Sequence, residues 1–583
     1  MTPSPVFSGG PLPAAPTNAV QAFSERVERS GPMPALETFP GGRRMTWAGW
    51  SRLASRFAAR LVDAGVRPGD RVAIWAGNRP LWPVADVGAL MAGAVPVGIY
   101  PSSAPAQVER LLADAGAVVA VADLTERVVL LKEMAGRGSG LRLVLTERDV
   151  DPGEGEGAAD RRGREAGPVD RRAPDPLPGT LADPDSDAVL IYTSGSTGEA
   201  KGARISHRTL MASAASIREA LGLREGDRTL SFLPYCHAAE RIFGLYTRIL
   251  AGMETILVED HRRVWDAAGA THPTLFGGLP RFFEKLEKTL RVREEAGGDP
   301  RRALRELVGE RVRLVTSGGA TLPEHVSTAL AGWGVQVLGA YGLTEHLCVA
   351  MNRPERLDAA TSGPPMPGTE LCIAADGEIL VRRGPLTFSG YLGRDDETRA
   401  AFTPDGEWLR TGDLGAVEGG FLRVTGRKKE VLALSTGKKV APAPLEHRLT
   451  AHPWIAQAML VGEGEPFVGA LIVPDREAVE GWVGRQGEEA PGAWPRILDD
   501  PRIRRRLVEA VQTVNREVSR TERVRRMVLL EDPFTAESEE LTPTLKLRRG
   551  RIGETRAGAV AALHRPDEPQ AAAWRDRALE VER

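Results

Sequence analysis

The sequence predicts an α/β fold, with a large N-terminal domain of mostly parallel sheets covered by helices and a smaller α+β C-terminal domain. A chain of 583 residues is too long for one ordinary core. Segments with apolar residues at helical spacing alternate with short apolar runs typical of strands, which indicates parallel sheets. The alternation ends near "TGRKKE" (425–430), where a different pattern begins.

The elements of the large domain follow in order. Residues 1–40 are rich in Pro, Gly and Ala and predict a loose N-terminal segment. "MTWAGWSRLASRFAARLVDAGV" then predicts a helix, and "GDRVAIWAG" predicts a strand. "WPVADVGALMAGAVPVGIYP" continues as helix and strand, "APAQVERLLADAG" as helix and "AVVAVAD" as strand.

Residues 150–186 contain Gly, Pro and charged residues with almost nothing apolar, so we expect an exposed connector. The pattern resumes at "AVLIYTSGSTG" and continues through "VRLVTSGGATLPEHVSTALAGWG" and "VQVLGAYGLTEH". We place the N-terminal domain at 41–427. The C-terminal domain follows at 428–555, with "IAQAMLVGE" and "PFVGALIVPD" as strands, and a frayed polar tail occupies 556–583.

Bulk properties exclude several classes of protein. The formal net charge is −2 and no long basic stripe is present, which argues against nucleic-acid binding. Cys236, Cys348 and Cys372 lie far apart without metal-ligand spacing, as expected in a reducing compartment. The N-terminus lacks the features of a secretory signal, and no apolar run is long enough to span a membrane. We therefore expect a soluble cytoplasmic protein.

The positions of the few lysines indicate candidate functional sites. Only nine of the 76 basic residues are lysines, and the other 67 are arginines. Nucleotide bias in the gene replaces surface lysine by arginine at little cost, so the surviving lysines mark positions that require a compact ammonium. Six of the nine fall in three short segments: Lys201; Lys428, Lys429, Lys438 and Lys439; and Lys546.

The stretch "IYTSGSTGEAKGARISH" (191–207) combines three glycines, several hydroxyl residues and one lysine after an apolar run. Glycines let the backbone turn tightly and point N–H groups at an anion, and Lys201 adds a point charge. The spacing differs from the Walker pattern. A Gly/Ser turn alone is more often only a turn, so the phosphate-binding interpretation depends on the other motifs. Ser206 is placed to cap a following helix.

These motifs carry a resemblance. "IYTSGSTGEAKG" resembles the phosphate loop of the adenylate-forming superfamily, which includes acyl-CoA synthetases, firefly luciferase and peptide-synthetase adenylation domains. "SGGATLPE", "YGLTEH", "TGDLG", "GRKKEVLALSTGKKVAPAPLE" and "LTPTLKLRR" follow in the family's order. "LPYCHAAER" and "PTLFGGLPRFFEKL" resemble specifically the long-chain fatty acyl-CoA synthetase branch. The resemblance covers roughly residues 45–555.

The resemblance implies an ATP site. Asp413 is a short carboxylate suited to both ribose hydroxyls, Tyr341 is suited to stacking on adenine, and Glu345 offers a hard oxygen to Mg²⁺. Thr193 shares the metal by resemblance. The implied nucleotide-binding residues are Thr193, Ser194, Gly195, Ser196, Thr197, Gly198, Lys201, Gly318, Gly319, Ala320, Tyr341, Gly342, Thr344, Asp413 and Arg427.

The resemblance also implies the remaining roles. His237 is placed beside the carboxylate pocket, together with Tyr235, Gly319 and His346. Lys429 occupies the family's hinge position and Gly437 lies near the route of the CoA pantetheine. Lys546 is the amine that bridges the substrate carboxylate and the α-phosphate, and it joins Glu345 and His237 as a predicted catalytic residue. The small domain is expected to rotate between the two half-reactions.

Each of these residues also has a structural interpretation: a packed histidine, a core tyrosine, a capping aspartate or a solvated basic run. The sequence also departs from the family. Glu199-Ala200 replaces a proline-containing step before Lys201, and His346 stands where family members usually carry a small hydroxyl residue. Only 20 residues separate "FEKL" from "LVGERVR", which leaves the tunnel length open.

The predicted function is ATP-dependent activation of an acid as an acyl-adenylate, followed by thioester formation with CoA. The alternatives keep adenylation but change the acid or the acceptor: an acyl-carrier-protein ligase, an aromatic acid ligase, or a nitrite-activating relative whose nitrite adenylate is attacked by an aryl amine to make a diazo group. A catalytically silent nucleotide-binding protein would be expected to lack Asp413, Glu345 or Lys546, and all are present. The sequence does not identify the acid, the oligomeric state or any association with a membrane surface.

Overall fold

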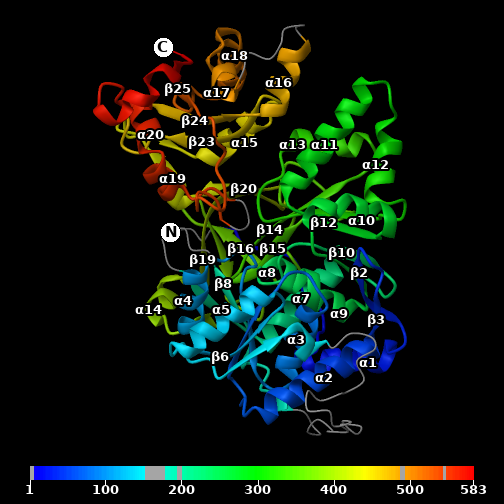
Figure 1. The fold of residues 1–583 in the computed structure, drawn as a ribbon. Coiled ribbons are helices and arrows are strands. Elements are labelled where there is room, and N and C mark those ends of the chain that lie inside the picture. Colours follow the sequence, from blue (N-terminus) through cyan, green and yellow to red (C-terminus); the bar gives the residue numbers. More distant parts are fainter. Residues whose placement is uncertain (1–4, 152–177, 194–199, 486–492, 543–545, 583) are drawn as a thin grey trace. The chain divides into compact units, whose positions relative to one another are not determined.

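The protein is described here by a computed structural model covering residues 5–151, 178–193, 200–485, 493–542 and 546–582 (Figure 1). The chain forms two compact units. The N-terminal unit comprises Met1–Ala374, Leu380–Thr411 and Val417–Arg423, and the C-terminal unit comprises Ala375–Ile379, Gly412–Ala416 and Val424–Arg583. The predicted α/β class is confirmed, since parallel strands and helices build the N-terminal unit.

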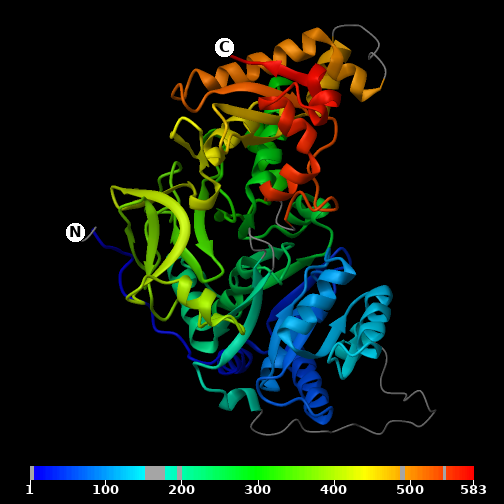
Figure 2. The same cartoon turned by 90° about the vertical axis from the view of Figure 1, so that its left-hand side faces the viewer.

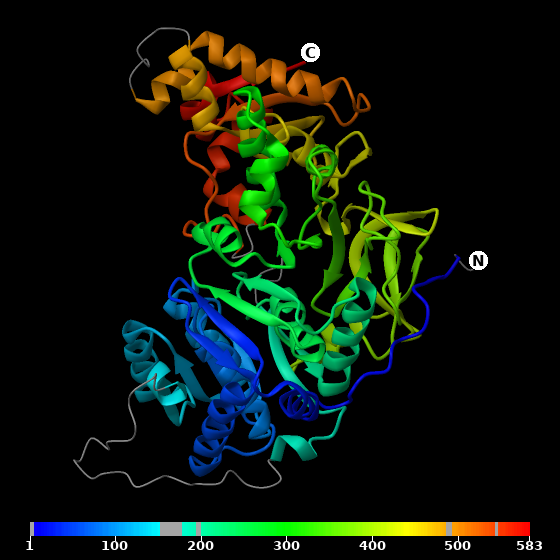
Figure 3. The ribbon, with the colours of Figure 1, turned by 90° about the vertical axis from the view of Figure 1, so that its right-hand side faces the viewer.

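An eight-stranded sheet forms one layer of the N-terminal unit. Its order is β15 (His346–Met351), β14 (Val337–Leu343), β13 (Leu314–Ser317), β12 (Leu275–Gly278), β10 (Arg228–Ser231), β11 (Glu254–Val258), β2 (Pro34–Phe39) and β3 (Arg44–Thr46). The six strands from β14 to β2 run parallel, and β15 and β3 pair antiparallel at the two edges. Figure 3 shows the blue β2–β3 hairpin continuing this sheet.

A seven-stranded sheet has the order β18 (Gly390–Tyr391), β9 (Lys201–Ser206), β8 (Asp187–Thr193), β5 (Val95–Gly98), β4 (Arg71–Trp75), β6 (Ala117–Ala122) and β7 (Leu143–Thr146). The strands from β8 to β7 are parallel, whereas β9 runs antiparallel to both β8 and β18. Such nearly continuous apolar strands, buried on both faces, are typical of parallel sheets covered by helices.

Helices cover these sheets because each presents an apolar stripe. In α2 (Trp47–Asp63), Trp50, Ala54, Phe57 and Leu61 recur at helical spacing and are buried. The other α-helices of this unit are α1 (Ala19–Ser30), α3 (Leu81–Met91), α4 (Pro105–Ala115), α5 (Thr125–Gly136), α6 (Glu147–Val150), α7 (His207–Leu221), α8 (Ala238–Arg241), α9 (Thr247–Ala251), α10 (Val264–Thr271), α11 (Pro280–Glu295), α12 (Pro300–Val308), α13 (Glu324–Gly332) and α14 (Asp395–Ala400).

The smaller sheets complete the chain. A five-stranded sheet has the order β1 (Phe7–Ser8), β16 (Glu370–Ile373), β17 (Glu378–Arg382), β19 (Trp408–Glu418) and β20 (Phe421–Arg427). Figure 2 shows β19 as a long, curved strand. The hairpin of β21 (Leu432–Ala433) and β22 (Lys439–Val440) follows. No helix in the described part of the chain is long and apolar enough to cross a membrane.

The expectation of a loose segment over 1–40 is wrong. Helix α1 occupies residues 19–30 and β2 occupies 34–39. Asn18 starts α1 because its side chain accepts hydrogen bonds from the backbone N–H groups of Val20 and Gln21. Phe23 is buried against Trp47 and Trp50, with ring centroids 6.3 and 5.0 Å away. The Pro- and Gly-rich composition of residues 1–40 therefore gave a wrong prediction, because the segment contains the amphipathic helix α1.

In the C-terminal unit, a four-stranded sheet has the order β23 (Ile455–Val461), β24 (Val468–Pro474), β25 (Val524–Leu529) and β26 (Ala578–Glu580). Its α-helices are α15 (Pro442–Thr450), α16 (Arg476–Arg485), α17 (Trp494–Asp499), α18 (Pro501–Asn515), α19 (Arg549–Thr555) and α20 (Ala557–His564).

The expectation of a polar tail over 556–583 is also wrong. Helix α20 buries Ala559, Ala562 and Leu563 in a core that includes Leu471 and Val528 of the sheet. Strand β26 pairs antiparallel with β25. Arginines and acidic residues alternate with the small apolar residues here, so the segment has low average hydropathy although one face is apolar.

We predict that Leu563→Ala destabilises the C-terminal unit by about 2–5 kcal/mol, because the fully buried side chain leaves a cavity. Urea unfolding of the full chain measures the change. The control is Leu181→Ala at a side chain that is 73% exposed, where we expect a change of less than about 0.5 kcal/mol. Equal effects of the two substitutions would mean that the terminal segment is not part of the core.

Candidate active site

The phosphate-loop motif begins and ends on two paired strands. Thr193 ends β8 and Lys201 starts β9, directly opposite each other in the antiparallel register. The Thr193 hydroxyl donates to the Lys201 carbonyl at 3.4 Å. The predicted residues Ser194, Gly195, Ser196, Thr197 and Gly198 lie outside the described residues. Strand β9 was not predicted, but Ser206 caps α7 as expected by accepting from the Thr209 N–H.

The Lys201 ammonium lies over an aromatic ring. Its Nζ is 5.3 Å from the ring centroid of Tyr391 and 3.9 Å from a carboxylate oxygen of Glu397. The side chain retains 27% exposure, so an anionic ligand has access to it. Tyr391 is brought here because β18 pairs with β9, with Tyr391 opposite Ala203.

Glu345 is the second group at Tyr391. Thr344 and Glu345 form the turn between β14 and β15, in which Leu343 pairs with His346. The Tyr391 hydroxyl donates to Glu345 Oε1 at 2.5 Å. Burial and the Glu345 charge raise the pKa of Tyr391 above its ordinary value, so the phenol stays protonated and donates. The structure therefore brings Lys201 and Glu345 to one tyrosine.

Tyr391 is a residue that the sequence analysis missed. It lies 46 positions from Glu345 and 190 from Lys201, so local spacing carries no sign of either contact. Its position between Gly390 and Gly393 is the one local signal, since glycines at φ 133° and 63° mark a special backbone.

The predicted adenine-binding residues lie in or directly after two neighbouring parallel strands, β13 and β14. Gly318 comes directly after β13, and Tyr341 lies in β14, which pairs with β13 through Ser317 opposite Gly339. Gly319 has φ 83°, which favours glycine, and both Gly319 and Ala320 are exposed. The carboxyl ends of parallel strands meet at one sheet edge, where ligands commonly bind.

Gly342 has a steric reason to be glycine. A Cβ at this position would lie 2.3 Å from the Leu347 carbonyl oxygen in the β14–β15 hairpin. A side chain here would therefore displace the turn that carries Thr344 and Glu345.

His237 caps the short helix α8. Its Nδ1 accepts a hydrogen bond from the Ala239 N–H at 3.2 Å, so Nε2 carries the proton in the neutral ring. The ring is partly exposed and remains a candidate for contact with the substrate.

Tyr235 differs from its predicted place in the substrate pocket. The side chain is 1% exposed and its ring lies 5.3 Å from that of Trp82. Burial raises the pKa of Tyr235 well above its ordinary value. The ring packs near Trp82 in the core, and a contact of Tyr235 with the substrate stays a prediction.

His346 is likewise enclosed and does not line an open pocket. The ring is 1% exposed, and its nitrogens lie 3.1 Å from Thr369 Oγ1 and 3.4 Å from Thr387 Oγ1. Because side chains alternate along a strand, His346 at the start of β15 points inward while Glu345 stands on the turn. Burial lowers the pKa of His346 to about 3, so the ring is neutral.

Three predicted residues of the C-terminal unit lie together. Arg427 Nε is 3.2 Å from Asp413 Oδ1, and Asp413 is 4% exposed. Lys546 is exposed, but nearby protein atoms and the Arg427 charge lower the pKa of its ammonium, while Asp413 and Glu430 oppose this shift. Asp413 is thus paired with Arg427, and both charges act on the Lys546 ammonium.

Asp413 belongs to this unit because short segments from earlier in the chain join it. The Lys428 ammonium binds Asp376 at 2.5 Å and Glu378 at 2.9 Å. A Glu378 oxygen accepts from the Gly412 N–H at 3.1 Å, next to Asp413. These bonds explain why residues 375–379 and 412–416 cluster with the C-terminal unit, whereas the sequence predicted a single boundary at 427.

The predicted hinge and CoA-route residues lie on exposed turns. Lys429 is exposed within the 3₁₀ turn Lys428–Glu430. Gly437 has φ 76° in the turn of the β21–β22 hairpin, and its N–H donates to the Leu434 carbonyl. Both positions are accessible, as a mobile connection and a ligand route require.

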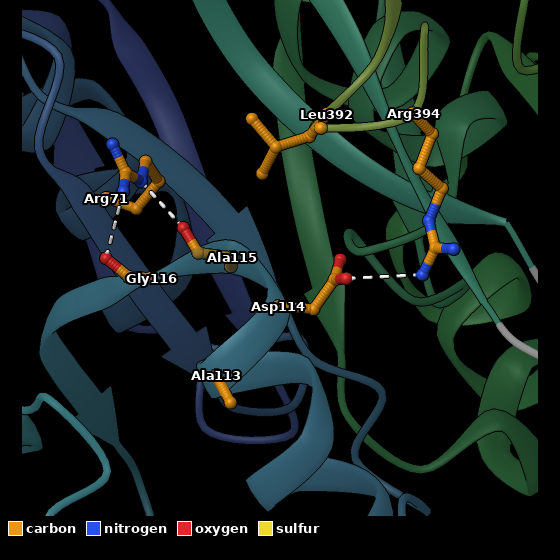
Figure 4. Close-up of a pocket in the computed structure, with 8 residues that line it drawn as sticks. Arg71, Ala113, Asp114, Ala115, Gly116, Leu392 and Arg394 are labelled. Atoms are coloured by element: carbon orange, nitrogen blue, oxygen red, sulfur yellow. Dashed lines mark hydrogen bonds and ion pairs between the residues drawn. The ribbon is translucent and has the colours of Figure 1, made fainter. Parts of the chain in front are cut away.

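The N-terminal unit also contains a pocket of about 440 Å³, whose lining includes Leu392 and Arg394, close to Tyr391 in the chain (Figure 4). Asp114 binds Arg394 at 3.3 Å and accepts from the Tyr192 hydroxyl at 2.6 Å. Arg71 donates to the carbonyls of Ala115 and Gly116 at the end of α4. The charged groups drawn here are engaged with one another or with the backbone.

Two models of known protein families match this chain. A family model for AMP-binding enzymes matches residues 23–392, and a model for the C-terminal domain of AMP-binding enzymes matches residues 429–563. The chain belongs to the AMP-binding enzyme family. The family resemblance predicted from the motifs is confirmed, and the chain lies in the long-chain fatty acyl-CoA synthetase branch.

Relatives named as long-chain-fatty-acid–CoA ligases match most of this chain. The long-chain-fatty-acid–CoA ligase FadD15 of Mycobacterium tuberculosis is 35% identical over 87% of this chain and 90% of that protein. The human long-chain-fatty-acid–CoA ligase 6 is 25% identical over 92% of this chain and 85% of that protein.

The anthranilate CoA ligase AuaEII in complex with anthranoyl-AMP has a TM-score of 0.73 at 22% identity, covering 94% of this chain and 98% of that chain. A fatty acyl CoA synthetase of M. tuberculosis has a TM-score of 0.63, also at 22% identity, covering 92% and 98%. These two structures share the fold.

We predict that acid destabilises the protein partly through His346. A folded pKa of about 3 lies below the ordinary 6.5, so the unfolded chain takes up the proton first. Stability present at pH 7 is therefore lost as pH falls below about 6.5, by about 2 kcal/mol at pH 5.

His346→Gln should lose about 2 kcal/mol less than the wild type between pH 7 and pH 5, measured by urea unfolding. The control, His261→Gln, changes an exposed histidine and should follow the wild type. An identical pH dependence in His346→Gln would contradict the neutral, buried assignment.

Proposed function

We propose that this protein is an ATP-dependent, AMP-forming ligase that converts a long-chain fatty acid into its CoA thioester. Membership in the AMP-binding enzyme family supports adenylation, and a 35% identical relative is named a long-chain-fatty-acid–CoA ligase. The observation that carries the proposal is the meeting of Lys201 and Glu345 at Tyr391, beside the strands that flank the phosphate-loop motif.

In the first half-reaction, a carboxylate oxygen of the acid attacks the α-phosphorus of ATP, and the bond to pyrophosphate breaks. Lys201 and the 193–201 segment bind phosphate oxygens, and Asp413 with Arg427 bind the ribose. The reaction brings two anions together, so a cation between them lowers the barrier. We assign this role to Lys546, which bridges the carboxylate and the α-phosphate.

In the second half-reaction, the sulfur of CoA attacks the acyl carbon and loses its proton. The bond between the acyl carbon and the AMP oxygen breaks, giving a thioester and AMP. Rotation of the C-terminal unit about Lys429 would remove Lys546 and open the route near Gly437 to the thiol.

We further propose Mg²⁺ as the metal, with Glu345 and Thr193 as its protein contacts. Among the described residues, no group of three or more His, Cys, Asp or Glu side chains is placed to hold a metal ion. Mg²⁺ usually binds through one or two carboxylates together with substrate phosphates. One protein carboxylate, that of Glu345, is therefore enough for such a site. Glu345 and Thr193 would hold the ion, which would supply positive charge to the phosphate oxygens.

A cytoplasmic location and a small-molecule acid as partner complete the proposal. Cys236, Cys348 and Cys372 are free and buried, consistent with a reducing compartment. The alternatives change the acid or the acceptor. His346, which suggested an unusual acid, lies enclosed between Thr369 and Thr387 and gives those alternatives no specific support.

The deciding experiment is pyrophosphate exchange into ATP by the full chain, with fatty, aromatic and inorganic acids in turn, with and without CoA. We expect exchange with long-chain fatty acids and AMP release coupled to thioester formation when CoA is added. Exchange with an aromatic acid or nitrite alone, or turnover indifferent to CoA, would favour an alternative. The absence of AMP formation with every acid would refute the proposal.

Lys546→Ala should reduce the rate of adenylate formation at least about a hundredfold, because the transition state loses a preorganised cation. ATP affinity should change little. Single-turnover formation of pyrophosphate measures the step, and Lys132→Ala, at an exposed lysine of the other unit, is the control. Near-normal exchange in Lys546→Ala would exclude the role.

Asp413→Ala should weaken ATP binding about tenfold to a hundredfold, because a buried charged acceptor of the ribose hydroxyls is lost. Calorimetric titration with ATP measures the affinity. Asp376→Ala is the matched control, since Asp376 also pairs with a basic side chain of this unit but has no assigned nucleotide contact. Unchanged affinity in Asp413→Ala would contradict the ribose assignment.

A further inference from the structure

Tyr391 connects two residues of the proposed ATP site. Its hydroxyl donates to Glu345 Oε1 at 2.5 Å, and its ring faces the Lys201 ammonium at 5.3 Å. Glu345 lies on the β14–β15 turn and Lys201 on β9, which belong to different sheets. Tyr391 is therefore a direct link between the eight-stranded and seven-stranded sheets at this point.

The backbone holds Tyr391 firmly. Its N–H donates to Thr398 Oγ1 at 2.9 Å, and the Thr398 hydroxyl donates to the Arg394 carbonyl at 2.8 Å. Gly390 has φ 133°, and a Cβ there would lie 2.8 Å from Thr398 Cγ2. The Phe388 ring packs edge-on at 4.9 Å. The phenol thus has one well-supported position.

The same segment fixes the Glu345 backbone. The Phe388 N–H donates to the Glu345 carbonyl at 2.9 Å, while Tyr391 binds the carboxylate of the same residue. Glu345 is held at both ends by residues 388–391. One Oε is engaged by the phenol, and the orientation of the carboxylate group is set by it.

We propose that Tyr391 is a positioning residue for nucleotide binding, which orients the Glu345 carboxylate for the divalent cation of ATP and places the Lys201 ammonium for the phosphates. The inference rests on the function proposed above. The hydroxyl acts on the metal contact and the ring acts on the lysine, so the two parts of the side chain have separable effects. Hydrogen bonds to a metal-binding carboxylate commonly control metal affinity.

The chain offers a matched control. Tyr192 is buried, and its hydroxyl donates to Asp114 Oδ2 at 2.6 Å in the same unit. Asp114 binds Arg394 and has no assigned role in the ATP site. Tyr192→Phe therefore removes the same kind of hydrogen bond without touching Glu345 or Lys201.

The experiment titrates Mg²⁺ into the full chain at fixed ATP without any acid, and follows ATP binding by tryptophan fluorescence or calorimetry. Tyr391→Phe should raise the Mg²⁺ concentration for half-maximal binding about tenfold. Its affinity for ATP without Mg²⁺ should stay at the wild-type value, since the ring remains under Lys201. Tyr391→Leu should weaken both. Tyr192→Phe should differ from the wild type by less than about twofold in either measurement.

A double-mutant cycle separates positioning from general stability. In a Glu345→Gln background, Tyr391→Phe should cause no further rise in the Mg²⁺ requirement, because its effect passes through the carboxylate. An unchanged requirement in Tyr391→Phe, or an equal rise in the Glu345→Gln background, would overturn the proposal. So would ATP binding that is independent of Mg²⁺ in the wild type.

Failure of the proposed ligase function gives a different result. A chain that binds ATP with Mg²⁺ but never forms pyrophosphate would refute that function. The titration would still decide the role of Tyr391.

Discussion

The antiparallel pairing of β9 with β8 on one side and β18 on the other is the constraint on which the N-terminal site depends. Register places Lys201 opposite Thr193, and Tyr391 opposite Ala203 two residues further along β9. An otherwise parallel sheet ends here in two antiparallel pairings, β8 with β9 and β9 with β18. A slip of one residue would turn the Lys201 side chain to the opposite face, so the position of the ammonium is fixed by the backbone ladder.

Much of the fold could be predicted from the sequence, because helical and strand periodicities are local. Helix α2 and strand β4 lie where their apolar spacing places them. Strand β9 was missed because "KGARIS" mixes charged and small residues, and its strand character comes from pairing with β8 and β18. Helices α1 and α20 were missed because Pro, Gly and charged neighbours lower the average hydropathy around their apolar faces.

The residues of the candidate site could also be predicted only in part. Motifs identified Lys201, Glu345, Asp413 and Arg427, because each motif holds a residue type that its chemistry needs. The sequence could not indicate that Tyr391 joins Lys201 to Glu345, since that contact depends on packing between strands far apart in the chain. Nor could it show that His346 points inward, which follows from the phase of β15.

The basic side chains of the candidate site have different acidic partners in the two units. In the N-terminal unit, Lys201 faces a ring and a carboxylate only 3.9 Å away, so its charge is moderated without a close ion pair. In the C-terminal unit, Asp413 forms an ion pair with Arg427. Nearby protein atoms and the Arg427 charge lower the pKa of Lys546, and the Asp413 charge raises it. Under the proposed function, Lys201 has only a distant carboxylate partner among the described residues and stays available to phosphate oxygens, whereas Asp413 keeps its charge paired with Arg427.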